Sequence, residues 1–260
     1  VKVLDMAPDE QPGAILVKIE AAVSDRTRLV FLSHIEYSSG LRMPVKEIRR
    51  LTKDRSIFIL LDGAQTAGHI TLDMKDIDAD FYSIPAQKWL LGSEGVGALY
   101  VRNDLIPQLE PMQVAGRASL TSADPYQFQP NISSIDKFLL TSTSAPLRAG
   151  MLEAIRFIQG IGVEEIESRN LDLATYAKQT LGEIPGVAVL SPLDRESSTG
   201  LVSFAIDGVD TKEAVAHLWE RHRIVARWVG FPPGIRIALH FFNTEEEVDR
   251  VVEAVQGLRQ

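Results

Sequence analysis

The chain has 260 residues, of which 45% are hydrophobic and 24% are charged, with a net charge of −8 and no cysteine. This balance is typical of a globular protein with a large core; it excludes disulfides and thiolate metal sites and disfavours nucleic acid as a partner. No apolar run approaches the roughly 20 residues that a membrane helix needs, so we expect no membrane partner and a cytoplasmic location.

Short apolar runs alternate with helical patterns in the first part of the chain. Helices are predicted over residues 14–23 and 44–53, and strands over 27–33, 57–61, 79–84 and 98–101. A continuous apolar run such as 27–33 is typical of a strand in a parallel sheet, and such sheets are covered on both faces. The alternation therefore predicts an α/β domain with a mostly parallel sheet.

A smaller α+β domain is predicted after an irregular stretch. Residues 111–137 hold several prolines and look like a long functional or interfacial loop. Helices are predicted over 145–160, 163–181, 211–222 and 244–258, and strands over 187–190, 200–206, 224–229 and 235–239. Thr244 and Glu247 form a capping-box pattern at the last helix. We expect two domains, 1–160 and 161–260.

Two neighbouring strands end in residues that can do chemistry. Asp62 follows the run 57–61, with Gln65 three residues later, and Lys88 follows the run 79–84, before a glycine-rich stretch over 92–97. Ligand crevices of open α/β sheets lie at the carboxyl ends of strands. A lysine there can form a Schiff base with a carbonyl cofactor, and a carboxylate can partner a pyridinium nitrogen.

The segment 62–102 resembles the class V branch of the fold-type I pyridoxal-phosphate enzymes, which includes cysteine desulfurases, cystine C–S lyases and isopenicillin N epimerase-like proteins. The matching residues are Asp62, Gln65, Asp80, Ala86, Gln87, Lys88 and the stretch 92–97. The resemblance continues through 27–40 and 234–250. It implies a fold-type I transferase whose large domain is incomplete at the N-terminus, because the family's phosphate-cradling turn and ring-stacking aromatic residue precede the matched part. We therefore expect a truncated chain.

The resemblance implies pyridoxal 5'-phosphate (PLP) as the cofactor and gives each matching residue a role. Lys88 would bind the cofactor and then take the α-proton of an amino-acid substrate. Asp62 would pair with the pyridine nitrogen, and Gln65 would donate to the phenolic oxygen of the ring. Gln87 and Ser142 would bind the phosphate, Ser142 that of the neighbouring subunit in a homodimer with shared active sites.

Three more residues are implied in substrate binding. Arg236 matches the arginine that binds the substrate α-carboxylate, for which a guanidinium fork is suited. Arg227 resembles the second cation of cystine lyases, and Tyr37 stands where desulfurases have asparagine, as on the lyase and epimerase side of the family. No metal site is expected, since the histidines at 34, 69, 222 and 240 have no metal-ligand spacing.

The absence of cysteine bears on the reaction. A persulfide-forming desulfurase is disfavoured, because no other side chain supplies a thiolate nucleophile. The preferred interpretation is a C–S lyase-like β-elimination on cysteine or cystine. An isopenicillin N epimerase-like racemase or epimerase and an aminotransferase remain alternatives. A non-catalytic pseudo-enzyme subunit or an inactive fragment is the rival from another class, favoured by Pro85, which replaces a phosphate-binding hydroxyl of many relatives.

Overall fold

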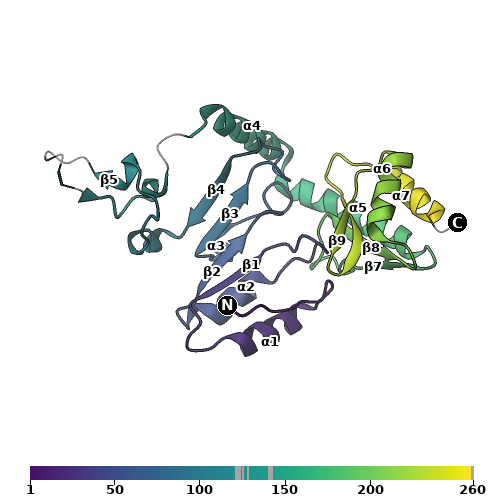
Figure 1. Ribbon diagram of the computed structural model, residues 1–260, viewed down its shortest axis with the longest axis horizontal. Coiled ribbons are helices and arrows are strands. Elements are labelled where there is room, and N and C mark those ends of the chain that lie inside the picture. The colour runs from purple at the N-terminus through teal and green to yellow at the C-terminus, as the bar shows by residue number, and fades with distance from the viewer. Residues whose placement is uncertain (121–123, 125, 128, 140–142, 259–260) are drawn as a thin grey trace.

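The computed structural model describes residues 1–120, 124, 126–127, 129–139 and 143–258. Two four-stranded sheets dominate this part of the chain, one in the order β1-β2-β3-β4 and one in the order β7-β8-β10-β9. Figure 1 shows the large sheet in the middle of the molecule and the small sheet at one end. A small two-stranded sheet, β5-β6, lies at the opposite end.

The large sheet is mostly parallel, as predicted. Strands β1 (Leu29–Ser33), β2 (Phe58–Asp62) and β3 (Phe81–Pro85) run parallel, and β4 (Gly97–Val101) pairs antiparallel with β3. Asp62 pairs with Ser33 on one side and with Ser83 on the other. The carboxyl ends of the three parallel strands therefore meet at one edge of the sheet, which places Asp62 and Lys88 after neighbouring strands.

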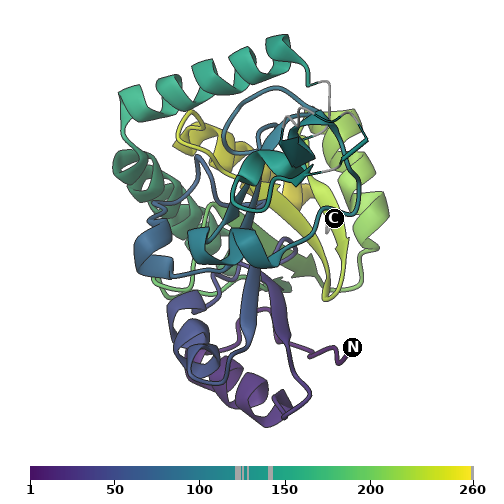
Figure 2. The same cartoon turned by 90° about the vertical axis from the view of Figure 1, so that its left-hand side faces the viewer.

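In the described part of the chain, α-helices cover one face of this sheet, and the opposite face is only partly covered, where Phe81 and Val101 pack on Leu105 and Ile106. Helices α1 (Pro12–Ala22) and α2 (Val45–Lys53) pack on the covered face through Ile15 and Ile48. The opposite face carries four apolar side chains that are 37–65% exposed: Leu29, Phe31, Phe58 and Leu99. The predicted helical coverage of both faces was wrong for the described residues: α4 (Ala145–Ile161) lies on the opposite side of the molecule from α1 and α2 and packs on the residues that follow β3 (Figure 2).

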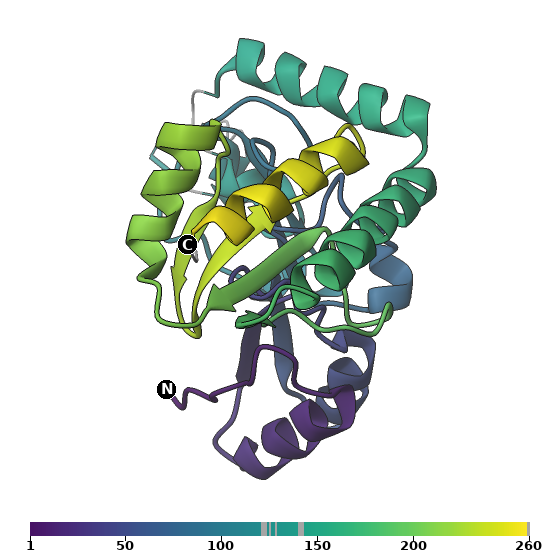
Figure 3. The same cartoon turned by 90° about the vertical axis from the view of Figure 1, so that its right-hand side faces the viewer.

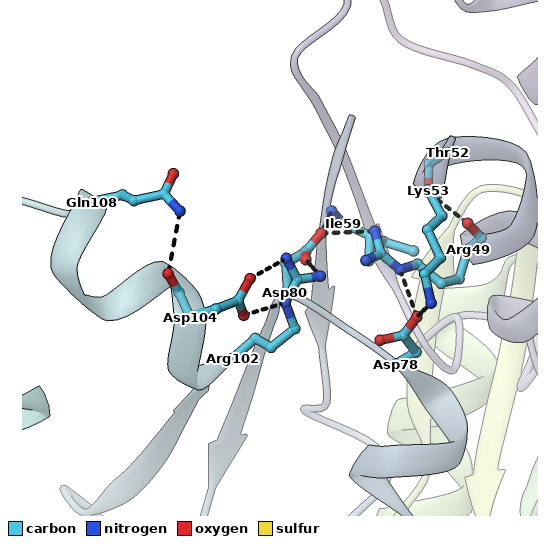
Figure 4. A network of polar contacts seen from close by, with 9 residues as sticks. All are labelled: Arg49, Thr52, Lys53, Ile59, Asp78, Asp80, Arg102, Asp104 and Gln108. Atoms are coloured by element: carbon cyan, nitrogen blue, oxygen red, sulfur yellow. Dashed lines mark hydrogen bonds and ion pairs between the residues drawn. The ribbon is translucent and has the colours of Figure 1, made fainter. Parts of the chain in front are cut away.

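A polar network anchors the start of β3, after the short helix α3 (Met74–Ile77) (Figure 4). The fully buried carboxylate of Asp80 accepts the Ile59 N–H at 2.7 Å, Arg49 Nη1 at 3.0 Å and Arg102 Nη1. Asp78 extends the network to Arg49 and, at 2.7 Å, to Lys53. Asp80 belongs to the family-like segment, but it lies at the opposite end of β3 from Lys88 and ties strands together.

The predicted irregular stretch contains only short pieces of regular structure among its described residues. They are the 3₁₀ turns η2 (Gly116–Ala118) and η3 (Ile135–Phe138) and the strands β5 (Ser119–Leu120) and β6 (Gln129–Pro130); another 3₁₀ turn, η1 (Asn103–Gln108), precedes the stretch. The Lys137 ammonium is buried and donates to the carbonyls of Ile106 and Ile132. This segment projects away from the small sheet (Figure 1).

Two long helices join the sheets. Helix α4 (Ala145–Ile161) buries Ala154 and Ile158 against Ala86 and Leu90, which follow β3. Helix α5 (Val163–Gly182) starts in the same cluster and then enters the core of the small sheet. Gly162 turns the chain between them with φ +103°, a conformation that L side chains avoid. The predicted domain boundary at 160/161 falls at this turn and stays a prediction.

The small sheet is antiparallel and forms the predicted α+β unit. Its strands are β7 (Val187–Val189), β8 (Leu201–Ile206), β9 (Arg227–Gly230) and β10 (Pro233–Ala238). Helices α6 (Thr211–His222) and α7 (Glu245–Gly257) pack with α5 on its outer side (Figure 3). The predicted capping box is confirmed, with Thr244 and Glu247 bonded reciprocally. Strand β9 begins three residues later than predicted, at Arg227.

Candidate active site

A cavity of about 790 Å³ lies where the end of β3 meets the β9–β10 hairpin. Five residues singled out from the sequence line it: Tyr37, Gln65, Lys88, Arg227 and Arg236. Apolar and aromatic side chains complete its wall, among them Trp89, Leu91, Val225, His240 and Phe242. Asp62 and Gln87 are outside the lining, and Ser142 lies outside the described residues.

Lys88 stands in a tight turn that follows β3. The turn is closed by the Leu91 N–H, which donates to the Lys88 carbonyl at 2.9 Å, and by the Gly92 N–H, which donates to the Ala86 carbonyl at 2.8 Å. A Cβ at Gly92 would meet the Ala86 Cβ at 2.9 Å, so this turn needs a glycine. Lys88 is exposed to the cavity, and its amine has no hydrogen-bond partner among the described residues. The amine is therefore accessible to a ligand.

Asp62 ends β2 beside the strand that carries Lys88. Its Oδ1 accepts the Ala64 N–H at 2.9 Å and the Ser83 hydroxyl at 3.4 Å. Oδ2 has no partner within the described chain. The side chain alternates with those of Ile59 and Leu61, so it lies on the open face of the sheet. A free carboxylate oxygen at this strand end is suited to a protonated ring nitrogen.

Gln65 is held at both of its oxygens. The side-chain Oε1 accepts the Trp89 indole N–H at 2.8 Å, and the backbone carbonyl is 2.8 Å from His69 Nδ1. The side chain is only 8% exposed, yet it reaches the cavity. Its amide nitrogen has no partner in the described part of the chain. Gln65 thus offers N–H donors to a ligand.

Two arginines face each other across the β9–β10 pair. Arg227 and Arg236 are direct partners in the register, so their side chains lie on one face of the hairpin. Arg236 Nη1 donates to the Tyr37 carbonyl at 2.6 Å, but its buried Nε has no partner among the described residues. Burial, and then the charge of Arg227, lower the pKa of Arg236. A carboxylate would satisfy Nε and offset both effects.

The phosphate side of the expected cofactor site is less complete. Gln87 is exposed and outside the cavity lining. Pro85 pairs with Gly97 at the end of β3 and supplies neither hydroxyl nor N–H. The residues present therefore fit the ring of PLP through Lys88, Asp62 and Gln65. The phosphate side rests on Gln87 and on the undescribed Ser142.

Trp89 and two histidines were not assigned to the site from the sequence. Trp89 and His240 line the cavity, and His69 stacks on Trp89. The histidines at 34, 69 and 240 are buried and hydrogen-bonded. The only sequence signal for Trp89 was its place next to Lys88, because its contacts come from distant segments.

The described residues contain no group of three or more histidine, cysteine, aspartate or glutamate side chains that would hold a metal ion. None of the helices in these residues is long and apolar enough to cross a membrane.

The curated relatives include proteins named for two different activities, epimerisation and cysteine desulfuration. Isopenicillin N epimerase of Streptomyces clavuligerus is 34% identical over 257 residues, which cover 95% of this chain and 64% of that protein. A probable cysteine desulfurase of Staphylococcus epidermidis is 31% identical over 274 residues, which cover 99% of this chain and 64% of that protein. The chain thus spans less than two thirds of the length of these relatives.

Solved structures show the same fold. The cystine C–S lyase C-DES, in complex with its product cysteine persulfide, superposes with a TM-score of 0.87 at 26% identity, covering 96% of this chain and 66% of that one. A lysine-to-alanine mutant of C-DES, with glycine covalently linked to the PLP cofactor, gives 0.84 at 27% identity, over 94% of this chain and 64% of that one. The predicted fold class, a fold-type I PLP-dependent transferase, is confirmed.

The family model named aminotransferase class-V matches residues 1–251. This match confirms the resemblance that the sequence indicated, and it agrees with PLP as the cofactor, since the C-DES structure carries PLP. Its relatives include PLP-dependent lyases, desulfurases and epimerases. The chain belongs to the aminotransferase class-V family.

Proposed function

We propose that this protein is a PLP-dependent enzyme that catalyses β-elimination on a sulfur amino acid, in the manner of a cysteine or cystine C–S lyase. One observation carries the proposal: a lysine with an unbonded amine, a glutamine with free N–H donors and a pair of arginines converge on one cavity. These groups match a carbonyl cofactor on one side and a carboxylate substrate on the other.

The residues of this chain would hold the cofactor as follows. Lys88 would be its covalent attachment point, Asp62 would accept from the ring nitrogen, Gln65 would donate to the phenolic oxygen, and Gln87 with Ser142 would bind the phosphate. When bound, PLP supplies an electron sink that stabilises negative charge at the substrate Cα.

Substrate binding and proton removal fall to Arg236 and Lys88. The Arg236 guanidinium would bind the α-carboxylate, because its buried Nε lacks a partner and Nη1 is already fixed by the Tyr37 carbonyl. Lys88 lines the same cavity and, once released from the cofactor, would take the α-proton. With no cysteine in the chain, the sulfur leaving group would depart directly from the substrate.

Arg227 would extend the site to a second carboxylate. It lies directly across from Arg236 and is exposed at the cavity. Cystine carries two carboxylates, whereas cysteine carries one, so this pair favours the larger substrate.

A second candidate is epimerisation at Cα. The 34% identity to isopenicillin N epimerase favours it. It needs the same proton removal by Lys88 and a second proton donor, for which the phenol of Tyr37 lines the cavity. Transamination is a third possibility that shares the same first step.

The reactions are distinguished by their products. The chain would be incubated with PLP and L-cystine or L-cysteine in deuterated water, with Lys88→Ala as the matched control. Elimination predicts pyruvate and ammonia that depend on Lys88. Inversion predicts D-amino acid with deuterium at Cα and no pyruvate. Equal PLP absorbance in the chain and in Lys88→Ala, with no product from either, would establish a pseudo-enzyme and overturn the proposal.

We infer further that the protein acts as a homodimer with shared active sites, in which Ser142 serves the partner subunit. Light scattering would report the oligomer. Mixing Lys88→Ala with Ser142→Ala subunits should restore activity, because one of the two sites in each mixed dimer is then intact. Absence of any recovery in confirmed mixed dimers would contradict the shared site.

A further inference from the structure

Trp89, the residue after Lys88, packs tightly between the rings of two histidines. Its side chain is 7% exposed and stacks on the His69 ring, with the ring centroids 3.5 Å apart and the planes 8° apart. The His240 ring lies at 5.0 Å on a tilted plane. His240 Nε2 is also 2.9 Å from the Trp89 carbonyl. Residues that follow strands of both the large and the small sheet therefore contact Trp89.

Two glycines allow the chain to approach Trp89 and His69 closely. A Cβ at Gly68 would meet the Trp89 carbonyl oxygen at 2.3 Å. A Cβ at Gly200 would meet the Leu239 carbonyl oxygen at 2.3 Å and His69 Nε2 at 2.9 Å. Both positions require close backbone approach, which only glycine allows. The chain at Gly68 thus lies against the backbone of Trp89, and the chain at Gly200 lies against the His69 ring and the edge of the indole, where a Cβ would meet Trp89 Cη2 at 3.1 Å.

The hydrogen bonds of His69 fix its protonation state. Nδ1 donates to the Gln65 carbonyl at 2.8 Å, and Nε2 accepts the Gly200 N–H at 2.7 Å. One ring nitrogen is therefore the donor and the other the acceptor, which describes a neutral imidazole. Burial also lowers the pKa of His69 to about 3. The face on which Trp89 stacks is a neutral ring of fixed orientation.

The indole dictates how the Gln65 amide is turned. An indole N–H is only a donor, so the atom that it meets at 2.8 Å must be the amide oxygen and not the amide nitrogen. The nitrogen, with its two donors, is then the end of the amide left for the cavity. Gln65 can donate to a ligand there but cannot accept from it.

We propose that Trp89 is a positioning residue that fixes the Gln65 amide so that its N–H donors face the cofactor. The proposal rests on the proposed PLP site and deepens it: the position opposite Gln65 is reserved for an acceptor oxygen, such as the phenolic oxygen of PLP. Without the indole, the amide would turn freely and present either end.

The first test needs no cofactor. In the ¹⁵N-labelled chain, the Trp89 indole N–H should exchange slowly with solvent, and Gln65→Ala should speed its exchange more than tenfold. Gln65→Glu keeps an acceptor for the indole and should retain the protection. Trp219 is a half-exposed tryptophan outside the cavity lining. Trp219→Phe identifies the indole signal of Trp219 by its disappearance, should leave the exchange of the Trp89 indole N–H unchanged, and serves as the control. Unchanged exchange in Gln65→Ala would overturn the coupling whether or not PLP binds.

The second test is a double-mutant cycle in which PLP affinity is measured by visible absorbance. Trp89→Phe keeps most of the ring stack and should weaken PLP binding about five- to tenfold, as expected for one lost hydrogen bond. In the Gln65→Ala background the same change should cost less than about twofold, because the amide is gone. Equal losses in both backgrounds would show a merely structural role for Trp89.

Gln65→Glu separates the two halves of the proposal. It should retain indole protection yet lose PLP affinity, since a carboxylate has no donor for the acceptor oxygen. PLP affinity equal to that of the unmodified chain would overturn the donor role. Failure of the unmodified chain to bind PLP would overturn the proposed function instead, and the exchange test would still decide the Trp89–Gln65 coupling.

Discussion

Arg236 and Arg227 face each other but have different surroundings. Arg236 is partly buried and fixed by the Tyr37 carbonyl, whereas Arg227 is exposed. Arg236→Ala should lower kcat/KM by the equivalent of about 2–4 kcal/mol on any amino-acid substrate, since it removes the α-carboxylate anchor. Arg227→Ala should affect cystine more than cysteine. Steady-state kinetics with both substrates would measure these losses.

Arg221→Ala is the matched control for this pair. Arg221 is an exposed arginine of α6 outside the cavity lining, so its removal should leave the kinetics unchanged. Equal losses on cystine and cysteine in Arg227→Ala would show that Arg227 binds no second carboxylate. That result would move the assignment from a cystine lyase towards an epimerase-like enzyme.

His69 predicts a specific loss of stability in acid. Burial lowers its folded-state pKa from 6.5 to about 3, so the unfolded chain binds a proton between these values that the folded chain does not. Stability therefore falls as pH drops from about 6.5 towards 3, by roughly 5 kcal/mol at the limit. Denaturant titrations of the chain and of His69→Gln should diverge across this window. Parallel pH profiles would refute the prediction.

At the scale of elements, the Asp80 network joins β2, α2 and the end of β4 to the start of β3. Asp80→Asn would leave Arg49 with a weaker partner in a buried place and should cost about 3–5 kcal/mol of unfolding free energy. Denaturant unfolding would measure it. PLP affinity of the folded fraction should not change, because the network lies at the far end of β3 from Lys88.

Asp104→Asn is the control for this change. Asp104 also pairs with Arg102, at 2.6 Å, but its carboxylate is at the surface. Exposed ion pairs contribute little, so the unfolding free energy should barely move. Similar losses in both variants would mean that burial of Asp80 is not the cause.

For the molecule as a whole, the open face of the large sheet is an exposed apolar surface. Phe31 is 65% exposed there, with Leu29 and Phe58 beside it, and Leu99 lies on the same face at the far strand β4. Contiguous apolar patches of this kind bind hydrophobic probes. Phe31→Lys should reduce the fluorescence of a bound hydrophobic dye. Val17→Lys, a similarly exposed position on α1, should not; equal reductions would place the dye elsewhere.

Strand ends and their chemistry were readable from the sequence. Asp62 and Lys88 follow continuous apolar runs, and such runs form neighbouring parallel strands, so their place after neighbouring strands of one sheet followed from period and order alone. The helix 211–222 and the Thr244 capping box were also predicted, because both depend on residues only three or four positions apart. The family resemblance then supplied roles for residues that local pattern cannot rank.

Only the tertiary structure determined which residues from distant parts of the sequence contact each other. The sequence placed Arg236 on the polar side of its strand, but only the β9–β10 register set it directly opposite Arg227. Trp89 reads as an ordinary apolar residue, yet its partners are Gln65 and His69 from the turn after β2 and His240 from the segment after β10. The expected cover on both faces of the sheet failed for the same reason. Side-chain periodicity reports that a strand face is apolar, whereas what packs against that face depends on contacts between residues far apart in the chain.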